Sequence, residues 1–95
     1  MAHGNVLTVY SATPAILNQV TDIINNLNLG FQQMESTFFI RTDDMDTATA
    51  LGTALFNADV TYTCVFIFDS TGCLLMDNNI SAAQENNINH QLVMP

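Results

Sequence analysis

Lysine is absent from the sequence, and Arg41 is its single arginine. Nine acidic residues stand against it, so the formal net charge is −8 at pH 7. A protein that binds DNA or RNA through phosphates needs several lysines or arginines, and an anionic membrane surface attracts the same residues. The charge balance therefore excludes electrostatic binding to nucleic acids and anionic membranes, and the missing lysine excludes Schiff-base and Walker-type chemistry.

Long apolar runs and clustered glycines are also missing. No run approaches the roughly 18 apolar residues of a membrane span. Residues 1–5 lack a basic side chain and the apolar run at 6–10 is short, so neither resembles a signal peptide. The four glycines are isolated, which excludes a glycine-rich phosphate loop. We therefore expect a cytoplasmic protein.

Residues that carry metal or nucleophilic chemistry are scarce. Cys64 and Cys73 lie in apolar, strand-like runs, and we interpret them as reduced core residues, with a disulfide as the alternative. His3 and His90 lie far from them and show no ligand spacing. No base stands beside Ser11 or either cysteine in the sequence. We predict no metal, no cofactor and no catalytic residue.

The chain is instead rich in apolar and uncharged polar residues. Hydrophobic residues make up 48% of the 95 residues and charged residues only 11%, which predicts one domain, residues 1–95, with a real core. Asparagine, glutamine, serine and threonine fill the polar surface. Because so few charges solvate the surface, we expect an apolar face that is available to a partner.

The first half of the chain alternates between strand and helix signals. Residues 6–10 form a β-branched, aromatic run that predicts a strand. Thr13 and Pro14 then predict a helix N-cap and first turn, and Gly30 predicts a left-handed stop. Strands are expected at 31–34 and 37–42, with a bend at 35–36. Phe38 and Phe39 point to opposite faces, so one belongs to the core; we expect the other on an open face, joined by Tyr62 or Phe66.

The second half repeats this alternation. A helix is expected at about 47–56 and a long strand at 60–68, followed by a turn at 69–72 and a returning strand at 73–76. Ser81 predicts the cap of a short helix over 81–89, and residues 86–95 carry weak signals of a loose tail. This order predicts an α+β, ferredoxin-like βαββαβ fold: an antiparallel sheet with two helices on one face and an extra C-terminal edge strand. We expect Leu74, Leu75 and Met76 to make a homodimer interface at that edge.

Several of these segments resemble a known family. They are Val9-Tyr10 at the end of the first strand, residues 35–40 in the third and Thr42-Asp43 before the second helix. Over residues 5–69 the chain is similar to the small ferredoxin-like proteins related to the dimeric subunit of the CRISPR spacer-acquisition complex, including the SinR-like and VapD-like groups. The resemblance implies the fold and a dimer. In family members that cut nucleic acid, an aspartate follows the tyrosine as a metal ligand; Ser11 stands there in this chain.

The acidic cluster of Asp43, Asp44 and Asp46 has two interpretations. It could bind a divalent cation, although it lacks the glycine and later glutamate of a calcium loop. We favour capping of the following helix, whose N-terminus attracts carboxylates. Arg41 could hold an anionic partner or pair with Asp43 or Glu35 within the chain.

These observations predict a non-catalytic, acidic protein–protein interaction module. It would dock on a basic surface of a nucleic-acid-handling defence complex, as phage or mobile-element inhibitors of CRISPR and restriction systems do. The predicted partner-binding residues are Asp43, Asp44, Asp46, Glu35, Arg41, Asp69 and Asp77. One alternative is a ferredoxin-like dimeric module that binds a regulatory small molecule; a second is a degenerate relative of metal-dependent nucleases.

Overall fold

The computed structural model describes residues 4–42, 44–69 and 72–92. It has three helices and five strands in an α+β arrangement, which confirms the expected class. The elements in chain order are β1 (Gly4–Val9), α1 (Pro14–Asn26), β2 (Phe31–Met34), β3 (Thr37–Arg41), α2 (Met45–Asn57), β4 (Tyr62–Asp69), β5 (Gly72–Asn78) and α3 (Ala82–Leu92).

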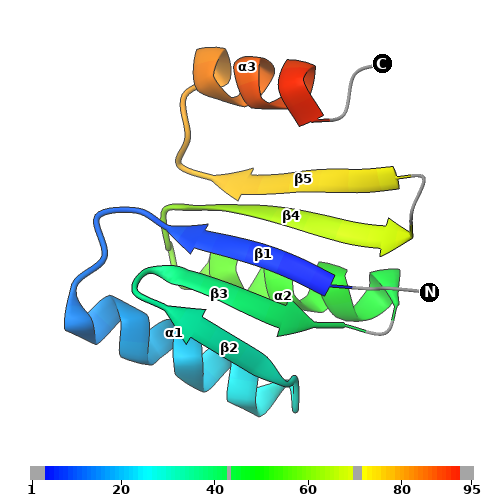
Figure 1. Ribbon diagram of the computed structural model, residues 1–95. Coiled ribbons are helices and arrows are strands. Elements are labelled where there is room, and N and C mark those ends of the chain that lie inside the picture. Colours follow the sequence, from blue (N-terminus) through cyan, green and yellow to red (C-terminus); the bar gives the residue numbers. More distant parts are fainter. Residues whose placement is uncertain (1–3, 43, 70–71, 93–95) are drawn as a thin grey trace.

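All five strands form one antiparallel sheet in the order β2-β3-β1-β4-β5, with β5 at the edge as expected. Figure 1 shows α1 and α2 side by side behind the sheet, and α3 beyond β5, apart from the other two. The order is roughly compatible with a ferredoxin-like fold. However, β5 and α3 add to the βαββαβ pattern, so the chain is not a plain unit of that kind.

The core lies between the sheet and the two helices behind it. Side chains alternate between the two faces of each strand, and the cross-strand pairs Leu7–Phe38 and Leu7–Cys64 place these three residues on the same face. All three are fully buried. The helices contribute Val20, Ile24, Leu51 and Leu55 to the same cluster. This face buries the apolar residues of three strands, so the opposite face of the sheet remains for other contacts.

The start of α1 is confirmed and its predicted stop is wrong. Thr13 is the N-cap, because its Oγ1 accepts a hydrogen bond from the Ile16 amide at 3.2 Å. The left-handed residue after the helix is Asn28, with φ 58°, and Gly30 does not adopt a positive φ. Asparagine tolerates this conformation better than most residues, so it ends the helix before the glycine.

The remaining left-handed positions also lie between elements. They are Ser11, Glu35, Asp59 and Asn79, with φ between 53 and 64°, and no described glycine shares this conformation. The bend expected at 35–36 is therefore present, with Glu35 as its left-handed residue.

The C-terminal part differs from the prediction in its lengths. β5 begins at Gly72 and ends at Asn78, because it follows β4 over most of that strand's length. Ser81 caps α3 as expected, since its Oγ accepts a hydrogen bond from the backbone N–H of Gln84 at 3.2 Å. The helix continues past the expected end at residue 89 to Leu92. Residues 86–92 of the predicted tail are therefore helical, and 93–95 lie outside the described part of the chain.

Candidate functional site

The face of the sheet opposite α1 and α2 carries a row of apolar side chains across four strands. In this row Phe39 of β3 pairs with Val6 of β1, Val6 with Val65 of β4, and Val65 with Leu75 of β5. Phe39 is 44% exposed, and the other three are half-buried. We call this surface the open face.

Of the two phenylalanines in β3, Phe38 is the buried one and Phe39 lies on the open face, as expected. The expectation that Tyr62 or Phe66 joins Phe39 is wrong, because both are buried on the core side at 3% and 1% exposure. Cys64, between them on the same side of β4, pairs with Leu7 of the core, and this register fixes the side on which they lie. Apolar residues at 60, 62 and 64 alternating with threonines at 61 and 63 indicate this orientation in the sequence.

Next to the apolar row, the open face is hollowed at Gly4. Gly4 pairs with Arg41 on one side and Ile67 on the other. Because glycine has no side chain, a pocket of about 340 Å³ lies there, walled by Phe39, Arg41 and Ile67. A methyl group at Gly4 would lie 3.3 Å from the Ile40 carbonyl oxygen. Ile67, at 40% exposure, and Phe39 thus give the open face two exposed apolar side chains on either side of a recess.

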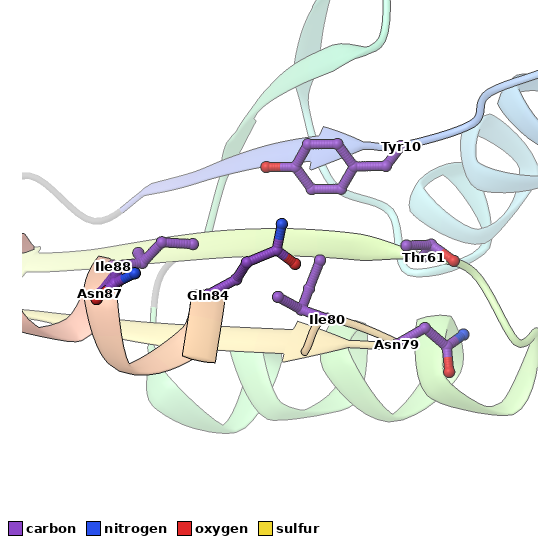
Figure 2. A pocket seen from close by; sticks show the side chains of 7 residues that line it. All are labelled: Tyr10, Thr61, Asn79, Ile80, Gln84, Asn87 and Ile88. Atoms are coloured by element: carbon purple, nitrogen blue, oxygen red, sulfur yellow. The ribbon is translucent and has the colours of Figure 1, made fainter. Parts of the chain in front are cut away.

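A larger pocket, of about 500 Å³, lies at the other end of the sheet, between Tyr10 and α3. Figure 2 shows the Tyr10 ring on one side, with Gln84, Ile80 and Ile88 pointing toward it from the α3 side. The Tyr10 hydroxyl forms a hydrogen bond with Thr63 Oγ1 at 3.1 Å, so the ring lies along the open face. The pocket is lined by Tyr10, Thr61, Asn79, Ile80, Gln84, Asn87 and Ile88.

Sequence reasoning missed this pocket. Its residues directly follow β1, directly precede β4, or belong to the segment from Asn79 to Ile88. The available signal was weak: Gln84 and Ile88 are spaced by four residues, which puts them on one face of a helix. The position of α3 beside the end of β1 is a long-range arrangement that local patterns do not specify.

The acidic residues predicted to bind a partner do not gather in one place. Asp44 and Asp46 lie at the start of α2, which follows β3 at the sheet end that holds Arg41. Glu35 lies in the β2–β3 turn at the opposite end, where Asp77 of β5 pairs with Thr63. Asp43 lies outside the described residues, as does the side chain of Asp69.

The capping interpretation is confirmed for Asp44. Its Oδ1 accepts hydrogen bonds from both the backbone amide and the hydroxyl of Thr47, each at 2.8 Å. Asp46 lies in the first turn, where a carboxylate interacts favourably with the helix dipole. Within the described ranges, no group of three or more His, Cys, Asp or Glu side chains is arranged to hold a metal ion.

The residues predicted for a dimer interface lie on different faces of β5. Leu75 is half-buried on the open face beside Val65, whereas Met76 packs against the core. The side chain of Leu74 lies outside the described part. Leu75 is therefore the described member that a second chain could reach on the open face.

Cys64 and Tyr62 are buried on the core side and are poor candidates for chemistry. Cys64 is a free, buried thiol, and burial raises its pKa from 9.0 to about 12. Burial also raises the pKa of Tyr62, helped by the neighbouring Cys64 and Asp77, from 10.0 to about 12. Since the thiolate is the reactive form of cysteine, Cys64 stays protonated and unreactive near neutral pH.

Comparison with protein-family models, curated proteins and solved structures gives no match for this chain. None of the helices in the described ranges is both long and apolar enough to cross a membrane.

Proposed function

We propose that this protein is a non-catalytic, acidic interaction module that docks through its open face onto a protein partner with a basic surface. The observation that supports it best is the pair Phe39 and Ile67, exposed on either side of the Gly4 recess in a chain with a net charge of −8. The proposal includes a ferredoxin-like core formed by β1 to β4 with α1 and α2.

The apolar row and the charge supply different parts of the binding. Burial of Phe39 and Ile67 against a partner provides affinity, since about 25 cal/mol is gained for each Å² of apolar surface removed from water. Acidic residues lie beyond both ends of the sheet, with Asp44 and Asp46 at the start of α2 and Glu35 in the β2–β3 turn. The net charge of −8 would attract a basic partner to the protein, because complementary charge accelerates encounter more than it tightens the final complex.

The proposed partner is the basic groove of a nucleic-acid-handling defence complex, so that the protein acts as an inhibitor of the CRISPR or restriction type. Such a groove is built to receive polyanions. Nine carboxylates in 95 residues are too few to reproduce a ladder of phosphates. Charge complementarity around an apolar patch is therefore the better description than mimicry of DNA.

The test uses purified defence complexes with basic grooves as probes, immobilised for binding measurements. We expect the Phe39→Ser variant to bind at least about tenfold more weakly, because truncating a hot-spot residue costs about 2 kcal/mol or more and a tenfold change corresponds to about 1.4 kcal/mol. Phe56→Ser is the matched control, since Phe56 is 64% exposed on α2, away from the open face. Equal binding by the Phe39→Ser variant and the unmodified protein would contradict the docking surface.

Salt dependence tests the electrostatic part. We expect the association rate to fall between about 50 and about 500 mM salt, because exposed charges are screened over roughly 10 Å at 0.1 M. A rate that does not change would contradict steering by charge. Retardation of an oligonucleotide on a native gel, or its cleavage with magnesium or manganese, would contradict the whole proposal.

A further inference from the structure

The pocket between Tyr10 and α3 has the chemistry of a small-molecule site, and it is separate from the recess at Gly4. Its volume of about 500 Å³ falls within the range of roughly 300–1,000 Å³ that is usual for ligand sites. The Tyr10 ring is 40% exposed and forms one wall, and the side chains of Ile80 and Ile88 face it from the other (Figure 2). An aromatic wall facing aliphatic side chains suits a flat, largely apolar molecule.

The polar groups of the pocket are amides and hydroxyls with both donor and acceptor capacity. The Oε1 of Gln84 accepts from Ser81 Oγ at 3.2 Å, which orients the amide and leaves its Nε2 as a donor. The Nδ2 of Asn79 donates to Asp59 Oδ1 at 3.1 Å, which leaves its Oδ1 as an acceptor. Asn87 lines the same pocket and adds a side-chain amide that can both donate and accept hydrogen bonds. Paired donors and acceptors of this type complement the edge of a nucleobase, as asparagine and glutamine do with adenine.

Charge narrows the class of ligand further. None of the described lining residues is charged, and the nearby Asp59 carboxylate accepts a hydrogen bond from the lining residue Asn79. A phosphate would therefore meet a neighbouring carboxylate and a chain with a net charge of −8, without a cation in the pocket wall to offset them. The ligand should be an uncharged heteroaromatic molecule rather than a nucleotide.

We propose that this pocket binds an uncharged purine base or nucleoside, which stacks on the ring of Tyr10 and forms hydrogen bonds with the amides of Gln84 and Asn87. Stacking on an aromatic side chain and edge recognition by amides are the means by which proteins recognise unpaired bases. This inference does not depend on the docking surface, and it gives a chemical class to the small-molecule alternative.

The experiment titrates the full chain with adenosine and with adenosine 5′-monophosphate, and follows backbone amide signals by NMR. We expect saturable shifts at Tyr10, Ile80, Gln84 and Ile88 with adenosine, and weaker binding of the monophosphate. No shift at millimolar adenosine would overturn the proposal, and so would tighter binding of the monophosphate. Shifts confined to residues around Gly4 would overturn it as well.

Two variants test the assigned contacts. Tyr10→Leu should weaken adenosine binding about tenfold, because it removes the aromatic ring on which the base stacks. Gln84→Glu keeps the shape of the side chain but replaces the donor with a carboxylate, so it should also weaken binding. The matched control is Gln91→Glu, an exposed position on α3 that does not line the pocket. If Gln84→Glu and Gln91→Glu bind adenosine equally well, the proposed hydrogen bond between Gln84 and the edge of the base is wrong.

Discussion

The side-chain amide of Asn5 donates a hydrogen bond to Thr42 Oγ1 at 3.0 Å in the buried core. Asn5 lies in β1 and Thr42 directly follows β3, and their exposures are 2% and 1%. The Oδ1 of Asn5 also accepts from the Cys64 thiol of β4 at 3.4 Å. One asparagine thus connects the three central strands of the sheet, at the end where the Gly4 recess opens.

This relationship predicts a large effect for a small substitution. Thr42→Val preserves the shape of the side chain but removes the hydroxyl acceptor, so the Nδ2 of Asn5 loses its hydrogen-bond partner in the core. We expect the free energy of unfolding to fall by about 1–3 kcal/mol, measured by urea denaturation. The double variant Asn5→Leu/Thr42→Val should recover part of this loss. If the effects of the two substitutions simply add, the hydrogen bond does not couple the residues.

Alkaline pH should destabilise the protein through Cys64 and Tyr62. Both groups have a pKa of about 12 in the folded chain, against ordinary values of 9.0 and 10.0. In the unfolded chain they lose their protons first, so unfolding releases protons above about pH 9 and rising pH favours the unfolded state. Their contribution to stability is complete below pH 9 and is lost as the pH approaches 12.

Urea denaturation at a series of pH values between about 7 and 11 measures this slope. Cys64→Ala and Tyr62→Phe each remove one titrating group, so each should make the decline shallower. A decline that is identical in both variants and in the unmodified protein would show that other groups cause it. In the folded Cys73→Ser variant, we also expect Cys64 to resist thiol reagents at neutral pH.

The cap of α2 predicts unequal effects for two neighbouring acids. Asp44→Ala removes the acceptor of both Thr47 hydrogen bonds and should lower stability by about 1 kcal/mol. Asp46→Ala removes only a favourable interaction with the helix dipole, roughly 0.3–1 kcal/mol. Thermal or urea unfolding of the two variants compares them. Equal losses would mean that the charge, and not the hydrogen bonds, accounts for the effect of Asp44.

The edge position of β5 leads us to propose a homodimer. An unpaired edge strand presents backbone donors and acceptors to a second chain, and Leu75 lies half-buried on that strand. We expect size-exclusion chromatography with light scattering to show a dimer at tens of micromolar. Leu75→Lys should shift the protein toward monomer, whereas Gln91→Lys adds the same charge on α3 and should not. A monomer for the unmodified protein would refute the proposal.

Local chemistry made part of this structure predictable. Thr13 and Asp44 act as caps because short polar side chains satisfy helix amides wherever a helix begins. Phe38 and Phe39 separate to opposite faces because strands have a period of two. The pocket could not be predicted in this way. It depends on the placement of α3 beside Tyr10, and an amide such as that of Gln84 carries no sign in the sequence that it faces a cavity.

The alternation at residues 60–64 indicates the inward orientation of Tyr62, but no local pattern indicates that of Phe66, for a physical reason. The second half of β4 is apolar on both faces, so its composition does not say which residues face the core. The pairing of Cys64 with Leu7 decides it, and such pairing joins segments far apart in the chain. The same limit applied to Met76, whose inward orientation follows from its pairing with Cys64.

The left-handed residues in the loops lower the thermal stability of the protein. Ser11 and Glu35 hold a backbone geometry that glycine adopts without steric conflict. Each residue therefore adds backbone strain, which raises the free energy of the native state. Neither residue lines one of the two pockets, so glycine at these two positions is the first change to make toward a higher melting temperature.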